Sequence, residues 1–234
     1  MSVLNFFQLI GISFCTIYTA ILGGICLVFS KKIGFWFCKN LWAKVICKIV
    51  GVQIESHNNH QLNEITKPVI FCANHQSNFD IIALYVSLDR PIYFIAKKEL
   101  KKIPFLGWYM QLAGMIFVDR SNRESAIKSM NNAGELILNG RNVVTFPEGK
   151  RSIDGNIKPF KKGSFFIAKQ NNINIIPIAI EGSYSINKPG SFRLKKGIIK
   201  INFGQIIESK KFNDIESLKQ ETKNKIVKIH KEII

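Results

Sequence analysis

Acidic side chains are scarce in this sequence. Its 234 residues include 16 Asp and Glu against 33 Lys and Arg, which gives a formal net charge of +17. Such a basic chain attracts either nucleic acid or the anionic headgroups of a membrane. We expect no nucleic-acid partner, because no recognition motif is present and the lysines are dispersed. A hydrophobic content of 47% and a mean hydropathy of +0.09 favour the membrane surface.

Metal-ligand spacings are absent as well. The five cysteines, at positions 15, 26, 38, 47 and 72, form neither a metal-binding pattern nor a paired framework. We therefore expect no metal site, and reduced cysteines that serve as small apolar residues. A Gly-x-Ser-x-Gly nucleophile elbow is also missing, so the sequence gives no signal for a serine acyl-enzyme.

Charged side chains are missing from Val3 to Phe29. This stretch exceeds the ~20 residues that a helix needs to cross the hydrocarbon of a bilayer. A signal peptide is disfavoured, because no basic region precedes the stretch and no clear cleavage site follows it. If the helix spans, Lys31 and Lys32 belong on the cytoplasmic side. The expected location is therefore a membrane, at the cytoplasmic face of the inner or plasma membrane.

The next stretch, Ile33 to Val50, is apolar but interrupted by lysines. With Trp36 and Trp42 at headgroup depth, it is typical of an interfacial amphipathic helix. Two arrangements stay open. One is a spanning helix followed by an interfacial one, to which we lean, and the other is a monotopic two-helix anchor bent at Gly23-Gly24. Residues 1–50 are predicted as this anchor and residues 51–234 as the catalytic domain.

From about residue 51, short apolar runs alternate with amphipathic segments. This alternation predicts an α/β domain, with a mostly parallel sheet flanked by helices. The predicted strands are 50–55, 69–72, 92–96, 115–118, 142–146, 175–181 and 198–204. The predicted helices are 79–88, 99–112, 122–138 and 162–171, with a closing helix in the last 20 or so residues. Asn213 is the expected cap of the closing helix, and Ser121 with Glu124 forms a capping box for the third.

The segment from Asn74 to Asp80 places a histidine and a carboxylate five residues apart, just after an apolar run. His75 can take a proton from an alcohol, and Asp80 can fix the tautomer of the ring. Five residues is a poor spacing for one helix face, so the pair needs a strand end, a turn and a helix start. Ser77 or Asn78 can cap that helix. Taken alone, such a pair is more often structural.

Four segments in order resemble the signatures of the glycerolipid acyltransferases, the 1-acylglycerol-3-phosphate acyltransferase family. Asn-His-x4-Asp resembles the first signature and Gly114–Arg120 the second. Phe146–Ser152 resembles the third, with Lys150 in place of the usual Thr, and Ile176-Pro177-Ile178 resembles the fourth. The resemblance covers residues 50 to 210, approximately.

The resemblance implies an O-acyltransferase that moves a fatty acyl group from a thioester to the sn-2 hydroxyl of lysophosphatidic acid. The product is phosphatidic acid, for phospholipid biosynthesis. His75 would act as the base and Asp80 would hold its other ring nitrogen, which leaves Ser77 an improbable nucleophile. No bound cofactor is expected. The partners would be a membrane lipid substrate and an acyl donor, either acyl-CoA or the thioester of acyl carrier protein.

The acceptor phosphate needs cations, and the resemblance links Arg120 and Arg151 to the headgroup. Lys97 and Lys98 are further candidates, although a solvated charged turn explains them equally well. Glu148 either binds a glycerol hydroxyl or orients one of the two arginines. Gly149 would let the substrate approach the backbone closely.

Two alternatives remain open. The first is a family member with another acceptor, such as glycerol-3-phosphate, a lysophospholipid or a lyso-aminolipid. The second, from a different class, is a non-catalytic basic protein that binds membranes or nucleic acid.

Overall fold

The computed structural model describes residues 2–119 and 123–234, and there it contains one seven-stranded sheet. The strand order is β1-β7-β6-β2-β5-β3-β4. Every neighbouring pair is parallel except β6 and β7, which run antiparallel. The predicted α/β class and mostly parallel sheet are thus confirmed. The strands are β1 (Val52–His57), β2 (Ile70–Ala73), β3 (Ile92–Lys97), β4 (Ile116–Val118), β5 (Asn142–Thr145), β6 (Ile175–Glu181) and β7 (Gly197–Phe203).

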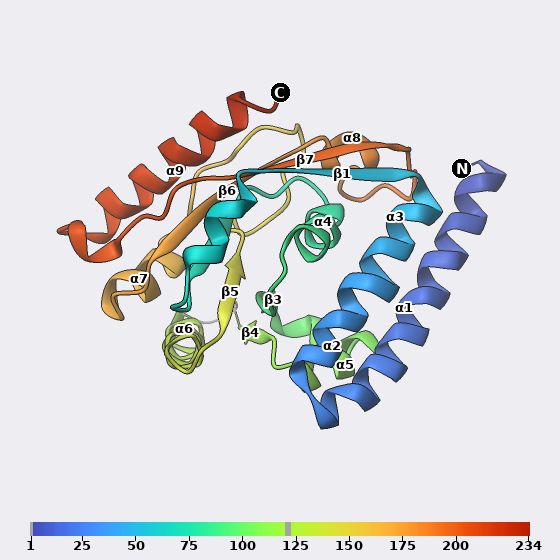
Figure 1. Ribbon diagram of the computed structural model, residues 1–234, viewed down its shortest axis with the longest axis horizontal. Coiled ribbons are helices and arrows are strands. Elements are labelled where there is room, and N and C mark those ends of the chain that lie inside the picture. Colours follow the sequence, from blue (N-terminus) through green and yellow to red (C-terminus); the bar gives the residue numbers. More distant parts are fainter. Residues whose placement is uncertain (1, 120–122) are drawn as a thin grey trace.

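Consecutive strand residues point to opposite faces of the sheet. Apolar residues lie on both faces here, and helices cover both. In β2, Phe71 and Ala73 pack with α4 and the N-terminal helices, whereas Ile70 and Cys72 pack with α6, α7 and α9. Figure 1 shows α6, α7 and α9 on one side of the sheet and α1 to α5 on the other. These helices are α4 (Phe79–Ser87), α6 (Arg123–Leu138), α7 (Gly163–Gln170) and α9 (Ile215–Lys231). Shorter elements are α8 (Ser183–Ile186), η2 (Asn59–Glu64) and η4 (Ser209–Lys211).

The helix predicted over 99–112 is two helices. A 3-10 helix, η3 (Lys98–Lys102), is followed by α5 (Leu106–Leu112). Pro104 lacks an N–H and disfavours the helical conformation of the residue before it. Phe105 has a φ of +61°, outside the helical region, so the chain turns there and starts a new helix.

Helix capping also differs from the sequence-based expectation. Asp214, not Asn213, caps α9, and its side chain accepts the N–H of Ser217 at 2.8 Å. At the start of α4 the Asn78 side chain makes no capping bond, while Ser77 Oγ accepts the N–H of Phe79 at 3.3 Å. The capping box expected at Ser121 lies outside the described residues.

The N-terminal 50 residues form a helical hairpin that packs on the rest of the chain. The first arm is α1 (Val3–Phe29), and the second runs through α2 (Lys31–Phe37), the π-helical η1 (Cys38–Ala43) and α3 (Lys44–Val50). A Cβ atom at Gly34 would lie 2.2 Å from Cδ2 of Leu27, so the two arms approach too closely there for a larger residue. The second arm shares the hydrophobic core of α4, since Ala43 and Ile46 are buried in the same cluster.

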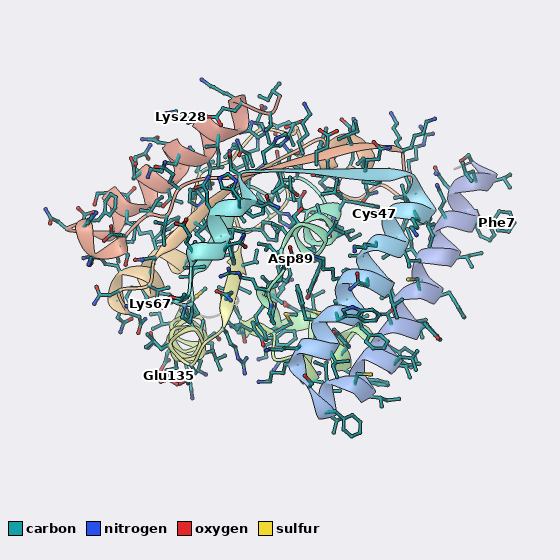
Figure 2. The ribbon with its side chains drawn as sticks, viewed as in Figure 1. Phe7, Cys47, Lys67, Asp89, Glu135 and Lys228 are labelled. Atoms are coloured by element: carbon teal, nitrogen blue, oxygen red, sulfur yellow. The ribbon has the colours of Figure 1, made fainter. Side chains whose placement is uncertain are left out.

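Helix α1 turns its polar and small residues toward the protein. Asn5 Nδ2 donates to the carbonyl of Leu194 at 3.0 Å, Gln8 Nε2 donates to the carbonyl of Ile49 at 3.1 Å, and Thr16 Oγ1 accepts from Trp42. The opposite face is exposed and apolar, as the outward Phe7 illustrates in Figure 2. It consists of residues three or four apart: Val3, Phe7, Ile10, Phe14, Ile17, Ile21, Ile25 and Val28. This is the reverse of the pattern on a water-exposed helix, and α1 is long and apolar enough to enter a membrane.

Candidate active site

The candidate active site lies at one edge of the sheet, where five parallel strands end. Strands β2, β3, β4, β5 and β6 run in the same direction, so their carboxyl ends meet at this edge, which is where α/β sheets bind ligands. The turn after β2 carries His75, and the turn after β5 carries Glu148. Lys97 ends β3.

His75 and the buried Asp80 are in contact, as the sequence predicts. His75 Nδ1 lies 2.7 Å from Asp80 Oδ2. The same oxygen accepts the backbone N–H groups of Gln76 at 2.7 Å and Ser77 at 2.9 Å. Asp80 is fully buried and occupies the first turn of α4, where the helix dipole favours negative charge. Three donors therefore fix one carboxylate oxygen.

The imidazole of His75 is held in place by its neighbours but remains partly accessible to solvent. Its ring stacks on Phe146 with the centroids 3.9 Å apart and the planes 13° apart. With Nδ1–H donating to Asp80, Nε2 keeps its lone pair, which makes Nε2 the basic atom. The side chain is 14% exposed, so a substrate hydroxyl can reach it. Phe146 belongs to the third signature, but no role of its ring is predictable from the sequence.

Asn74 joins the turn of residues 75–77, which we call the catalytic turn, to the sheet. Its Nδ2 donates to the carbonyl of Ile180 at 2.9 Å, and its Oδ1 accepts the N–H of Ile180 at 2.8 Å. The carboxamide thus pairs with β6 as a peptide group would, one residue beyond the end of β2. This explains why an amide side chain precedes His75, because both groups of Ile180 would otherwise be buried without partners.

Glu148 holds two backbone segments rather than another side chain. Its Oε1 accepts the N–H of His75 at 2.9 Å, and its Oε2 accepts the N–H of Lys158 at 3.1 Å. The residue is 4% exposed. Burial raises the pKa of Glu148 to about 7, and the charge of Asp80 adds to the rise while the two backbone bonds oppose it. This geometry corresponds to neither role weighed from the sequence, a glycerol hydroxyl or an arginine.

Arg151 precedes a residue that bonds to the backbone of His75. The next residue, Ser152, donates its N–H to the carbonyl of His75 at 2.7 Å. Among the described residues, the guanidinium of Arg151 forms no hydrogen bond or ion pair. Arg120 lies outside the described residues. Gly149 has a φ of +76°, a conformation that favours glycine.

Lys97 and Lys98 lie at the same sheet edge but already have acidic partners. Lys97 Nζ is 3.1 Å from Glu99, and Lys98 Nζ is 3.0 Å from Asp119, which follows β4. Both lysine side chains are more than half exposed. Pairs whose lysine is this exposed contribute little to stability, so an anion can compete for either lysine. Within residues 2–119 and 123–234, no group of three or more His, Cys, Asp or Glu side chains could hold a metal ion.

The known proteins that this chain resembles are acyltransferases. The family model described as Acyltransferase matches residues 53–181. The 1-acyl-sn-glycerol-3-phosphate acyltransferase of Saccharomyces cerevisiae is 35% identical over 75% of this chain and 58% of its own length. That of Chlamydomonas reinhardtii is 35% identical over 73% of this chain and 51% of its own. The chain therefore spans about half the length of these curated relatives.

A solved structure matches nearly the whole chain. The crystal structure of the 1-acyl-sn-glycerophosphate (LPA) acyltransferase PlsC from Thermotoga maritima aligns with a TM-score of 0.85 at 25% identity. The alignment covers 98% of this chain and 95% of the other. The likeness therefore includes the N-terminal hairpin as well as the sheet.

The raised pKa of Glu148 predicts a pH-dependent stability. Between pH 4.5 and about 7 the folded state keeps a proton that the unfolded state releases. Glu148 therefore stabilises the fold most below pH 4.5, and this contribution is lost as the pH rises through 7. We expect the Tm of the wild type to exceed that of Glu148→Gln at pH 5, and this excess to shrink as the pH rises to 8.

The control is Glu64→Gln at an exposed carboxylate, whose Tm profile should run parallel to that of the wild type. A difference between the wild type and Glu148→Gln that stays constant over this pH range would contradict the prediction.

Proposed function

This chain belongs to the acyltransferase family, and from that premise we propose that it acylates the sn-2 hydroxyl of lysophosphatidic acid. The acyl group comes from a thioester, and the product is phosphatidic acid. The observation that carries the proposal is the 2.7 Å contact between His75 Nδ1 and the fully buried Asp80. The named activities of the yeast, algal and Thermotoga maritima relatives support the choice of acceptor.

The geometry supplies a base for the attacking hydroxyl. His75 Nε2 takes the proton as the hydroxyl oxygen attacks the thioester carbonyl, and Asp80 stabilises the imidazolium that forms. When the tetrahedral intermediate collapses, the C–S bond breaks and the departing thiolate takes the proton from His75. The substrate hydroxyl is thus the nucleophile, so no side chain becomes acylated.

Cations at the sheet edge suit the phosphate of the acceptor. Arg151 has a guanidinium without a partner among the described residues, and its planar fork can bind two phosphate oxygens at once. Lys97 and Lys98, whose own side chains are more than half exposed, can turn from their acidic partners to the same phosphate. Arg120 follows β4 in sequence, and we assign it to the headgroup on the family resemblance alone. Gly149 contributes its positive φ to the turn that precedes Arg151.

The donor is the thioester of either coenzyme A or acyl carrier protein. Both carriers are anionic, so the net charge of +17 favours the approach of either one. Glycerol-3-phosphate, lysophospholipids and lyso-aminolipids remain alternative acceptors to be compared in the same assay.

The N-terminal hairpin anchors the enzyme on a membrane. The outer face of α1 continues onto α5, where Trp108 and Leu112 are more than half exposed. Between the two helices lies an apolar groove of about 330 Å³, which Ile21, Ile25 and Phe105 help to line. A surface of this kind is suited to lipid chains. We assign this apolar surface to contact with the cytoplasmic face of the inner or plasma membrane.

The contacts of α1 favour an anchor in one leaflet over the spanning helix to which the sequence analysis leans. Helix α1 is bonded to the protein near its N-terminus through Asn5 and Gln8, and further along through Cys15, which donates to the carbonyl of Leu41 at 3.2 Å. Because these bonds hold α1 along its length against the second arm and the rest of the chain, we infer that α1 lies in one leaflet.

The dyad is tested with thioester consumption by membranes that contain the full chain. We expect turnover with lysophosphatidic acid, and a loss on the order of a thousandfold or more in kcat for His75→Ala and Asp80→Asn, because the base or its tautomer is lost. Thermal unfolding of each variant shows whether the fold persists. Glycerol-3-phosphate and lysophosphatidylcholine serve as competing acceptors. Turnover by either folded variant at a near wild-type rate would exclude the mechanism.

The one-leaflet anchor predicts the accessibility of both ends of α1. After the five native cysteines are replaced by alanine, single cysteines are placed at Ser2, at Lys31 and, as a reference for the catalytic domain, at exposed Asn59. In sealed vesicles, an impermeant maleimide should label all three from the same side. Labelling of Ser2 and Lys31 from opposite sides would show a spanning helix instead.

A further inference from the structure

We propose that Glu181 and His230 form a second histidine–carboxylate pair, which positions the catalytic dyad through Gln76. The proposal rests on the proposed function, because it makes His230 a positioning residue for the acyl transfer. It concerns a residue on the last helix of the chain, more than 150 positions from His75 in sequence. None of the four signatures includes Gln76 as a reacting group, and none includes Glu181 or His230.

The pair links the C-terminal helix to the catalytic edge of the sheet. His230 Nε2 lies 2.7 Å from Glu181 Oε2. Glu181 is the last residue of β6, the neighbour of the strand that leads to His75. The side chain of His230 is 13% exposed and that of Glu181 is 32% exposed. A short contact that is partly shielded from solvent is worth more than a fully exposed surface pair.

Gln76 connects this pair to Asp80. Its backbone N–H donates to Asp80 Oδ2 at 2.7 Å, so any movement of residue 76 changes the hydrogen bonds of the dyad. Its side chain, in a residue only 2% exposed, donates from Nε2 to the carbonyl of Gly155 at 2.8 Å and to Glu181 Oε2 at 3.4 Å. Its Oε1 accepts from Ser183 at 3.4 Å. The carboxamide is therefore held from three directions, and one of the three is Glu181.

His230 fixes the orientation of the Glu181 carboxylate. The hydrogen bond from His230 is the largest cause of the lowered pKa of Glu181, and Gln76 contributes in the same direction. Without the imidazole, a carboxylate that is one-third exposed gains hydration by turning to solvent. Its contact with Gln76 would then be lost, while the bond from Gln76 to Gly155 remains. We expect a loosened catalytic turn rather than an unfolded one.

The chain offers a matched control on the same helix end. Glu232 Oε2 accepts from Asn202 Nδ2 at 2.9 Å, which is also a bond between the end of α9 and the sheet. Asn202 lies on β7 and has no bond to Gln76 among those of the described residues. Glu232→Ala therefore loosens α9 without touching the connection to Asp80. His230→Gln places an amide donor close to the position of the imidazole Nε2 and should restore the bond to Glu181.

Hydrogen exchange gives a readout that does not depend on the acyl acceptor. In the detergent-solubilised full chain, the amides of Gln76 and Ser77, which donate to Asp80, are followed by mass spectrometry of peptides spanning 74–80. His230→Ala should speed their exchange severalfold, whereas His230→Gln and Glu232→Ala should resemble the wild type. Unchanged exchange in His230→Ala, or equal acceleration in Glu232→Ala, would overturn the proposal, even if the proposed function is correct.

Kinetics then test whether the positioning matters for transfer. With lysophosphatidic acid as acceptor, His230→Ala should lower kcat on the order of tenfold, with KM changed by less than twofold, because geometry at the base is lost and not substrate binding. The effect should be non-additive with that of Glu181→Ala. A wild-type kcat in His230→Ala contradicts the proposal. If the wild-type protein is inactive with every acceptor, the proposed function is wrong. The exchange result still tests whether Glu181 and His230 hold Gln76 in place.

Discussion

The site depends on one buried carboxylate oxygen, Oδ2 of Asp80. Burying a charge costs several kcal/mol unless donors replace the lost water. Two backbone N–H groups and the His75 ring do so at Oδ2 within 2.9 Å, while the buried Oδ1 has no hydrogen-bond partner among the described residues. Those donors exist only if residues 75–77 form a tight turn between β2 and α4. The same hydrogen bonds that make Asp80 tolerable in the interior therefore set the orientation of the base. Asn74 and Glu148 secure the turn from either side, by bonding to β6 and to the backbone of His75.

One loop connects the N-terminal hairpin, the proposed membrane anchor, to this turn. In the segment 187–196, the carbonyl of Asn187 accepts from Ser77 Oγ at 2.7 Å, and the carbonyl of Leu194 accepts from Asn5 of α1. The catalytic turn is thus fixed relative to the helix whose outer face is apolar. For an enzyme with a lipid acceptor, this arrangement presents the base at a constant position relative to the lipid surface. The bond between Asn5 and this loop also explains why α1 has polar residues on the side that faces the protein.

Much of this structure is predictable from the sequence, and the exceptions have physical reasons. Apolar runs such as that of β2 identify the strands, because strands buried on both faces are continuously hydrophobic. The His75–Asp80 contact follows from a motif whose spacing requires a strand, a turn and a helix. The break at Phe105 depends on a local φ that periodicity does not report, although Pro104 is a signal for it. The choice of Asp214 over Asn213 as cap is a difference of one position, within the usual uncertainty of helix ends.

The supporting residues of the site are not predictable from the sequence. Glu148 stands in a signature, but its partners are backbone groups, which no side-chain pattern reveals. Glu181 and His230 are 49 positions apart and come together only because α9 packs on β6. No spacing rule predicts such a contact in a single sequence, whereas it is plain once the strand order is known.

The tautomer of His75 is the most direct test of the mechanism. It is read by nitrogen NMR of the histidine-labelled protein, with His75→Ala to assign the signal among the four histidines. We expect the wild-type ring to carry its proton at Nδ1 and not at Nε2, and this preference to be lost in Asp80→Asn. A ring protonated at Nε2 in the wild type would leave no base facing the substrate and would contradict the mechanism.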